Sequence, residues 1–317
     1  MSLDLAAIRA AAARIAPHVK RTPVLTNDAL DSAAGAQLFF KCENLQAMGA
    51  FKARGAANAV FALTDAEAAR GVVTHSSGNH GAAVARAARL RGISGIIVMP
   101  HNAPQTKIRN VESYGGKIVF CEPNLTAREA ACAEIVAQTG AALVHPFDDY
   151  AVMAGQGTAT LELLEQAGPL DLILCPVGGG GLLCGTAVAA KGARPGIRMV
   201  GIEPAAADDV AQSFRAKSPV SIAHADTIAD GLRTNVTGQR NLPLILQHVD
   251  DIVTVSEDAI VTAMRTLWQN LKIVIEPSAA VPFAAIQSGA LDVGGQRVGI
   301  ILTGGNVDLD TLPWLKR

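Results

Sequence analysis

Residues 41–58 have the sequence Lys-Cys-Glu-Asn-Leu-Gln-Ala-Met-Gly-Ala-Phe-Lys-Ala-Arg-Gly-Ala-Ala-Asn, in which an extended start leads through a Gly-Ala-Phe turn into an alanine-rich segment. Lys52 stands where this segment predicts the beginning of a helix. Apolar surroundings and the positive partial charge of a helix N-terminus both lower the pKa of an amine, so Lys52 is a candidate nucleophile. A solvated lysine in a first helical turn is the commoner case, and other motifs have to decide between the two interpretations.

Strand-like and helix-like segments alternate along the rest of the chain. A helix over 4–16, a strand over 37–42 and a helix over 53–63 come first, followed by strands over 72–75, 95–99 and 117–121 and helices over 80–91, 104–114 and 125–139. A second series predicts a helix over 155–166, a strand over 170–177, a helix over 182–190 and a strand over 198–203, and the chain closes with a helix over 256–270 and a strand over 297–303. This alternation predicts an α/β protein of two lobes, each a mainly parallel twisted sheet flanked by helices, with ligands at the carboxyl ends of the strands.

The composition limits the kinds of partner. The 317 residues are 50% hydrophobic and 4% aromatic, with a formal net charge of −1 and no long run of like charge. We therefore expect no nucleic acid and no anionic membrane as partner, and no apolar run reaches the roughly 18 residues that a membrane span needs. Five scattered cysteines without a C-x-x-C pair indicate reduced thiols and a cytoplasmic location.

Four consecutive glycines, Gly178, Gly179, Gly180 and Gly181, lie between a predicted strand and a predicted helix. Bare amides at a helix N-terminus bind phosphate well. The spacing is not that of a Walker A motif. A dinucleotide site is a serious alternative because Glu203 closes the next strand, although Leu183 breaks the G-x-G-x-x-G pattern. A tight turn that only allows close packing is a third possibility.

Two further polar stretches follow predicted strands. Residues 74–81, Thr-His-Ser-Ser-Gly-Asn-His-Gly, combine small side chains and hydroxyls with a helix start, which suits a carboxylate, and Asn79 offers both a donor and an acceptor. A plain helix cap is the alternative, but one capping residue would suffice. Thr303 would present a neutral hydroxyl at the end of the last strand. An activated lysine, a phosphate loop, an amide and a carboxylate loop together describe pyridoxal phosphate with an amino-acid substrate.

With these motifs in the order Glu-Asn-Leu-Gln, Ser-Ser-Gly-Asn-His, Ala-Gly-Gln-Gly-Thr and the four glycines, the chain resembles the fold type II pyridoxal-phosphate enzymes, in the branch of serine racemase, serine/threonine dehydratase and 3-hydroxyaspartate dehydratase. The resemblance runs from Thr22 to Asn306. It implies a large cofactor-binding domain of residues 1–62 and 149–317, a small mobile substrate-binding domain of residues 63–148, and a homodimer.

The resemblance also implies roles for the residues already singled out. Lys52 is similar to the Schiff-base lysine and catalytic base, Phe51 lies beside the ring, Asn79 bonds the ring hydroxyl, Gly178 to Gly181 hold the phosphate, and Thr303 faces the pyridine nitrogen. The family usually has Ser or Cys at this last position. Substrate binding falls to Ser76, Ser77, Gly78, His80 and Arg128.

The same resemblance bears on the reaction. The racemases and hydroxyaspartate dehydratases resemble this chain in having Ser at the position of Ser77. A serine there can act as an acid or base on the opposite face of the cofactor ring. The chain resembles the dehydratases in having Phe147 at its position. Arg128 resembles an arginine of the racemase branch that could bind a second carboxylate of the substrate, although a solvated helix arginine is an equal alternative. The favoured activity is elimination of water from a 3-hydroxy amino acid, with 3-hydroxyaspartate preferred; L-serine/L-threonine dehydratase and serine racemase are the alternatives. A cofactor-binding protein without turnover and a nicotinamide dehydrogenase are less favoured.

Residues 203–209 resemble the divalent-cation site of the family. Glu203 and Asp209 would supply carboxylates and Ala207 a carbonyl, a donor set that suits Mg²⁺, Ca²⁺ or Mn²⁺. Two solvated acids near a strand end are the alternative interpretation.

Overall fold

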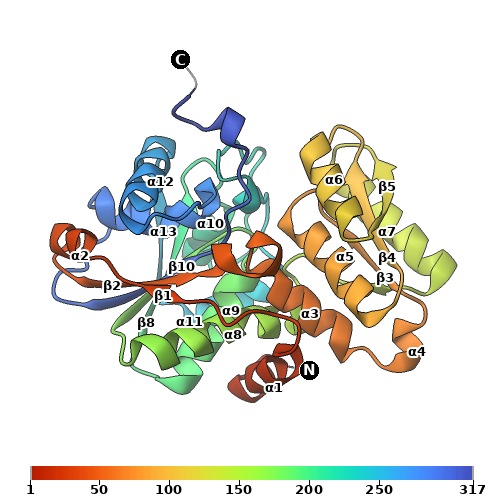
Figure 1. Cartoon of the computed structure of the whole chain (residues 1–317), viewed down its shortest axis with the longest axis horizontal. Coiled ribbons are helices and arrows are strands. Elements are labelled where there is room, and N and C mark those ends of the chain that lie inside the picture. The colour runs from red at the N-terminus through yellow and green to blue at the C-terminus, as the bar shows by residue number, and fades with distance from the viewer. Residues whose placement is uncertain (1, 316–317) are drawn as a thin grey trace.

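In the computed structural model, which describes residues 2–315, the strands of these residues form two separate sheets (Figure 1). The large sheet has six strands, in spatial order β1 (Val24–Leu25), β2 (Gln37–Cys42), β10 (Arg297–Leu302), β7 (Leu172–Pro176), β8 (Arg198–Pro204) and β9 (Asp251–Val255). The small sheet has four, in the order β5 (Lys117–Cys121), β4 (Gly95–Pro100), β3 (Val72–His75) and β6 (Ala142–Leu143). All neighbouring strands are parallel except β1 with β2. The predicted two-lobed, mainly parallel α/β fold is confirmed.

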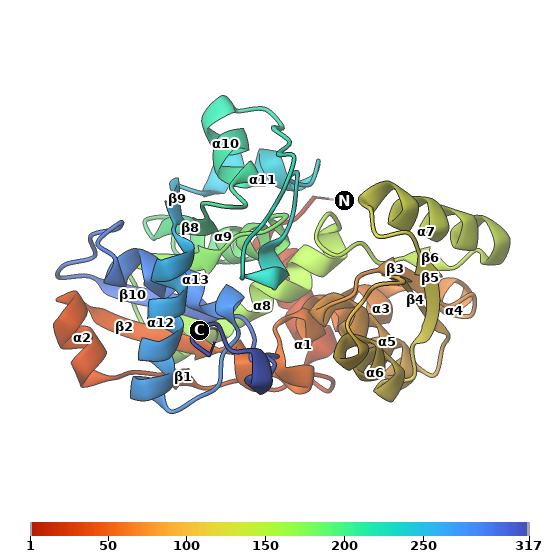
Figure 2. The same cartoon turned by 90° about the horizontal axis from the view of Figure 1, so that it is seen from above.

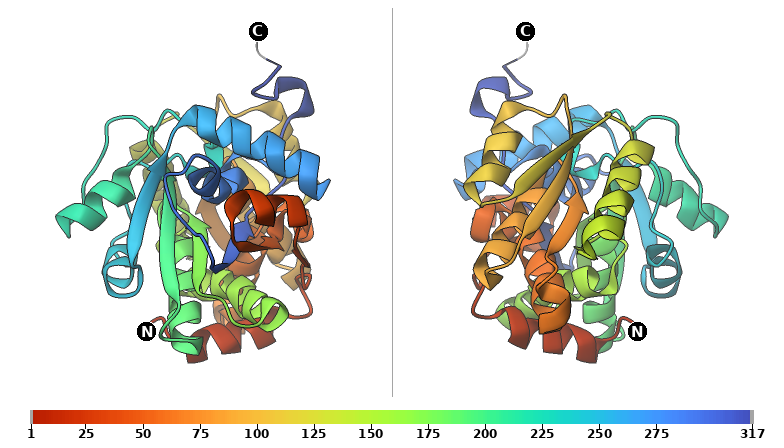
Figure 3. Two further views of the ribbon diagram at one scale, coloured as in Figure 1. Left: turned by 90° about the vertical axis from the view of Figure 1, so that its left-hand side faces the viewer. Right: turned by 90° about the vertical axis from the view of Figure 1, so that its right-hand side faces the viewer.

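Helices cover both faces of each sheet (Figures 1 and 3). One face of the large sheet packs against α2 (Asp28–Ala34), α12 (Glu257–Leu271) and α13 (Pro277–Gln287). The other face packs against α1 (Leu5–Ile15), α8 (Tyr150–Ala167), α9 (Gly181–Ala193), α10 (Asp209–Ala216) and α11 (Asn241–His248). The small sheet lies between α7 (Leu125–Thr139) on one face and α5 (Asn79–Arg91) and α6 (Gln105–Ser113) on the other, with the short α4 (Asp65–Ala68) leading into β3.

Helix α3 (Lys52–Ala62) lies at the junction of the two sheets, which Figure 2 shows side by side from above. It contacts α8 of the large lobe and α5 of the small lobe. The first residue of α3 is Lys52, so the fold carries the candidate nucleophile to the boundary between the lobes.

The helix predicted to begin at Gly155 begins at Tyr150 instead. Asp149 caps it by accepting hydrogen bonds from the amides of Ala151 and Val152. Its glycines allow close packing against neighbouring helices: a Cβ on Gly155 would lie 2.6 Å from the Arg54 carbonyl oxygen of α3. The predicted start was wrong because tertiary packing places glycine inside this helix.

Several elements carry too weak a local pattern to be predicted. Helix α13 is apolar on all sides and contains Pro282, so it has no amphipathic periodicity. Strand β9 and helices α2, α4, α10 and α11 are short. The predicted helix over 125–139 has the same bounds in the structure.

None of the helices in residues 2–315 has both the length and the hydropathy needed to span a bilayer. All five cysteines are free thiols.

Candidate active site

Lys52 occupies the first position of α3, half-buried, with its Nζ 2.7 Å from the carbonyl oxygen of Pro146. Phe51 precedes it and packs its ring beside the amine, with Nζ 5.2 Å from the ring centroid. Burial of the charged form lowers the pKa of Lys52 from 10.5 to about 8. A lysine with this pKa keeps a substantial neutral fraction near neutral pH, as a nucleophile or base requires.

The four glycines form the turn from β7 into α9, and all four are buried. A side chain would not fit there: a Cβ on Gly179 would lie 2.5 Å from the Phe147 ring, and Gly180 has a φ of +98°. Within residues 2–315, the amides of Gly178, Gly179 and Gly180 donate to no protein acceptor. Free amides beside a helix N-terminus are suited to an anion.

Thr303 follows β10 and is buried, with its hydroxyl lacking any partner among the described residues. Its carbonyl accepts a 2.9 Å hydrogen bond from the Phe51 amide. A buried hydroxyl is costly without a partner, so a ligand atom that bonds to it would remove this cost.

The loop of Ser76, Ser77 and Gly78 follows β3 and leads into α5. The Gly78 amide donates to Ser76 Oγ over 3.2 Å, and no side chain caps the start of α5. All three residues are partly exposed. The first turn of α5 is thus open to an anion such as a carboxylate.

Asn79 is held by a network that the sequence did not predict. Its amide nitrogen donates to both carboxylate oxygens of Glu276, over 3.0 and 3.2 Å, and its carbonyl oxygen accepts from Asn306 Nδ2 over 2.9 Å. Glu276 precedes α13 and is buried. Burial, reinforced by the Asp230 carboxylate, raises the pKa of Glu276 to about 7. An acid just before a proline gave no local signal of this contact.

His80 is buried behind the same loop. Its Nε2 lies 3.1 Å from the Val144 carbonyl oxygen, so this nitrogen carries the proton, and Nδ1 has no partner among the described residues. Burial, with the nearby Lys52 amine as a second cause, holds the pKa of His80 well below its usual value. His80 is therefore a neutral side chain that supports the loop.

Arg128 lies in the first turns of α7, with a buried Nε that has no partner among the described residues. Its charge contributes to the lowered pKa of His75, after the larger effect of burial, and opposes the raised pKa of Cys121. His75 ends β3 and Cys121 ends β5, so Arg128 lies at the edge of the small sheet from which the Ser76–Gly78 loop leaves.

A family model described as pyridoxal-phosphate dependent enzyme matches residues 15–304. The chain belongs to this family. It is 49% identical over 305 residues to the beta-hydroxyaspartate dehydratase of Paracoccus denitrificans, covering 96% of each chain. It is 48% identical over 314 residues to a serine racemase of Oryza sativa, covering 98% of this chain and 92% of that relative. The structure of maize serine racemase matches with a TM-score of 0.96 and 46% identity, covering 99% of this chain and 97% of that one. The protein is a pyridoxal-phosphate-dependent enzyme of fold type II, as its motifs predicted.

The residues fit this cofactor. The free amides of the glycine loop suit its phosphate, the unpartnered Thr303 hydroxyl suits a ring nitrogen, and the Lys52 amine suits its aldehyde. The Asn79 amide nitrogen donates to Glu276 and its carbonyl oxygen accepts from Asn306, so a ring hydroxyl bound to Asn79 would join this network.

The predicted metal ligands also lie together. Glu203 lies next to the end of β8, fully buried, and accepts from the amides of Val210 and Ala211. Asp209 starts α10, and its Oδ2 has no partner among the described residues. Burial, with the neighbouring carboxylate adding to it at Glu203, raises both pKa values, that of Asp209 to about 7. Two buried acids with a free oxygen fit a hard cation. Within residues 2–315, no three acidic, histidine or cysteine side chains converge, so Ala207 and water would have to complete the coordination.

Proposed function

We propose that this enzyme eliminates water from a 3-hydroxy amino acid, with 3-hydroxyaspartate as the preferred substrate, and releases ammonia and the corresponding keto acid. The observation that carries the choice of substrate is Arg128, a cation with an unpartnered Nε at the sheet edge beside the Ser76–Gly78 loop. A dicarboxylate offers one carboxylate to the loop and a second to the guanidinium. The name of the Paracoccus relative supports the same substrate class.

Bound pyridoxal phosphate supplies an electron sink for the bond broken at the substrate α-carbon. The chain supplies the rest. The loop from Ser76 to Gly78 binds the α-carboxylate, and the Lys52 amine, whose pKa of about 8 suits proton transfer, takes the α-proton. The β-hydroxyl then leaves as hydroxide, which completes the elimination. The released enamine becomes an imine, and water hydrolyses this imine to the keto acid and ammonia. A neutral Thr303 hydroxyl does not protonate the ring nitrogen, which favours prompt loss of the β-leaving group.

Serine racemisation is the second candidate, and Ser77 is the observation that favours it. This half-exposed hydroxyl belongs to the substrate loop, where it can serve as an acid or base opposite Lys52. L-serine/L-threonine dehydration is a variant of the leading proposal that does not use Arg128.

Our proposal also includes the divalent cation at Glu203, Ala207 and Asp209, a homodimer, and a cytoplasmic location, which the five free thiols support. We further propose that residues 63–148 form a small domain that moves relative to residues 1–62 and 149–317. The ion pair between Lys107 of α6 and Asp230 of the large lobe, at 2.6 Å, supports a closed arrangement of the two.

One assay tests the proposal directly. Purified enzyme with pyridoxal phosphate and Mg²⁺ is given L-serine, L-threonine and each 3-hydroxyaspartate isomer, and ammonia and keto acid are measured, with D-serine formation followed separately. The highest kcat/KM should belong to a 3-hydroxyaspartate isomer. A higher kcat/KM for serine or threonine, or D-serine formed faster than ammonia, would reject the leading substrate or the leading reaction.

A further inference from the structure

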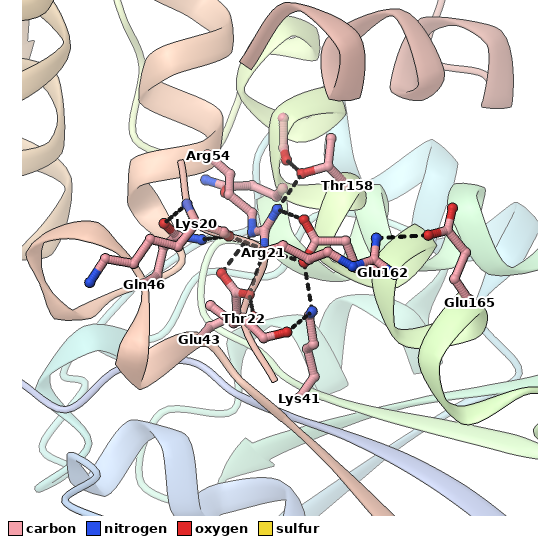
Figure 4. A network of polar contacts seen from close by, with 12 residues as sticks. Lys20, Arg21, Thr22, Lys41, Glu43, Gln46, Arg54, Thr158, Glu162 and Glu165 are labelled. Carbon is pink, nitrogen blue, oxygen red and sulfur yellow. Dashed lines mark hydrogen bonds and ion pairs between the residues drawn. The ribbon is translucent and has the colours of Figure 1, made fainter. Parts of the chain in front are cut away.

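Arg54 is the largest fully buried side chain of the described residues, and it stands two positions after Lys52 in α3. Its guanidinium forms a two-pronged ion pair with Glu43, through Nε at 2.7 Å and Nη2 at 2.8 Å. A second pair joins Nη1 and Nη2 to Glu162 over 2.7 and 2.8 Å, and Nη1 also donates to Thr158 Oγ1 over 3.1 Å. Figure 4 shows these acceptors gathered around Arg54 from separate segments. Every guanidinium donor therefore has a partner.

The charges in this network balance. Lys41, also fully buried, donates to Glu162 Oε2 at 2.6 Å, to the Thr22 carbonyl at 2.7 Å and to Gln166 Oε1 at 3.0 Å. Two cations thus face the two carboxylates of Glu43 and Glu162. Burial alone would raise the pKa of Glu162, but the hydrogen bonds from Arg54 and Lys41 hold it below its usual value. Removal of one partner from such a set of buried ion pairs leaves an uncompensated buried charge.

The network lies on the side of α3 opposite Lys52. Residues two apart on a helix point in directions about 200° apart, so Lys52 and Arg54 project from opposite sides. Glu43 follows β2 and Glu162 lies on α8, so Arg54 joins α3 to two elements of the large lobe. Strand β2 is also connected to Thr303, because β10, which Thr303 follows, pairs with β2 along its whole length.

No local cap holds the start of α3. Phe51, at the N-cap position, makes no side-chain capping bond. Besides the Phe51 amide bond to Thr303, the turn is held by tertiary contacts: the Gly55 amide donates to Gln156 Oε1 over 3.1 Å, and a Cβ on Gly55 would lie 2.8 Å from the Val152 carbonyl oxygen. Helices α3 and α8 are therefore in close backbone contact beside Arg54.

We propose that Arg54 is a positioning residue: its paired contacts with Glu43 and Glu162 hold the first turn of α3 so that the Lys52 amine stays at the place and in the half-buried setting where it reacts with the cofactor aldehyde. The inference rests on the proposed function of Lys52. Arg54 is fully buried with its donors bonded to protein acceptors, so it acts through the backbone of α3.

Four variants separate positioning from stability. Arg54→Lys keeps the charge but replaces the planar guanidinium, which bonds both carboxylates, with one ammonium nitrogen on a flexible side chain. The double variant Arg54→Met/Glu43→Gln removes one charge of each sign, so the charges of the remaining Lys41 and Glu162 still balance. Arg54→Met alone leaves the Glu43 carboxylate without its partner and therefore measures the loss of stability from an unbalanced buried charge. Thr158→Val, which removes one acceptor of Arg54, is a milder change in case the others do not fold. Arg21→Ala is the matched control, because Arg21 forms an exposed 2.8 Å ion pair with Glu165 beside the network (Figure 4).

Two readouts do not depend on turnover. In cofactor-free protein, the rate of acylation of Lys52 is followed against pH by mass spectrometry; the midpoint should be about 8 in wild type and Arg21→Ala and at least one pH unit higher in Arg54→Lys. With cofactor at saturation, borohydride traps the cofactor on Lys52, and the trapping rate should fall at least tenfold in Arg54→Lys and in the double variant. The double variant should regain melting temperature relative to Arg54→Met without regaining the trapping rate, and kcat should fall more than KM rises.

A folded Arg54→Lys variant with the wild-type acylation midpoint and trapping rate would overturn the proposal. So would trapping that recovers in step with the melting temperature, since the network would then only stabilise the fold. If only Thr158→Val folds, it should slow trapping about twofold to threefold, and an unchanged rate counts against positioning. Wild-type protein that traps no cofactor on Lys52 would instead refute the proposed function, while the acylation comparison would still test Arg54.

Discussion

The Phe51 amide donates a 2.9 Å hydrogen bond to the Thr303 carbonyl, so the residue before Lys52 is bonded to the residue that offers its hydroxyl to the site. Phe51 directly precedes α3, and Thr303 directly follows β10. This bond joins the residue before α3 to the residue after β10 across 252 residues of sequence separation, as counted from the two residue numbers. The two proposed cofactor contacts are therefore linked directly through the backbone.

Replacing Thr303 with Val should keep the fold and the covalent attachment at Lys52 but lower kcat. The change removes a buried hydroxyl that has no protein partner, so the cofactor-free protein should lose no stability. Loss of one hydrogen bond to the ring predicts a roughly tenfold lower kcat. Thr303→Ser should behave like wild type, and Thr160→Val, which removes another buried unpartnered hydroxyl on α8, should not change kcat. A wild-type rate in Thr303→Val would remove this residue from the site.

Arg128→Gln should alter substrate preference more than overall activity. If the guanidinium binds the second carboxylate, kcat/KM for 3-hydroxyaspartate should fall by about 10- to 100-fold, as expected for a lost charged hydrogen bond, and that for L-serine by less than threefold. Arg109→Gln on the exposed face of α6 is the matched control. An equal decrease in kcat/KM for both substrates would show that Arg128 does not bind the second carboxylate.

Glu276 should make the stability of the cofactor-free protein depend on pH. Its folded-state pKa of about 7 lies above the usual 4.5, so its contribution is fully present below pH 4.5 and is lost as pH rises through 7. The facing groups are Asp230, Lys107 and Asn79. The free energy of unfolding of wild type relative to Glu276→Gln, measured by urea titration, should therefore decrease between pH 5 and pH 8.

Asp230→Asn should weaken that pH dependence, because it removes the carboxylate that adds to the raised pKa of Glu276. A difference between wild type and Glu276→Gln that stays constant or grows over this range would show that Glu276 is already ionised in the folded protein.

Mg²⁺ should stabilise the protein through Glu203 and Asp209. At 100 times its dissociation constant, a ligand that binds only the folded state adds about 2.7 kcal/mol, and a chelator should reverse the resulting rise in melting temperature. Asp209→Asn should abolish the response. Asp208→Asn, which changes the neighbouring carboxylate bonded to Gln212, should retain it. The same rise in all three proteins would place the cation elsewhere.

Much of the site was predictable because its parts are set by short-range requirements. Lys52 had to stand at a helix start, four glycines had to form a turn without side chains, and the Ser76–Gly78 loop had to precede a helix. The backbone conformation that each motif requires can be recognised from a few consecutive residues. The order of the motifs was enough to indicate the family, which the comparisons confirm.

The partners of these motifs were not predictable. Glu276 meets Asn79 from 197 residues away, and Glu162 meets Arg54 from 108 residues away. Neither carboxylate stands in a pattern that distinguishes it from a solvated acid, because its role depends on which surface it is packed against. The predicted helix start at Gly155 was wrong for the same reason. Glycine is required there by close packing against α3, which neighbouring residues in the sequence do not reveal.

The sequence by itself determined the alternating α/β architecture, the position of Lys52 at a helix start and the turn of four glycines before a helix, because backbone geometry and hydrophobic periodicity act over short stretches. Only the tertiary structure decided which buried charges face one another, how the pKa values of Lys52 and Glu276 are shifted, and that Arg54 lies behind the lysine. These properties depend on desolvation and on distances between segments that become neighbours only when the chain has folded.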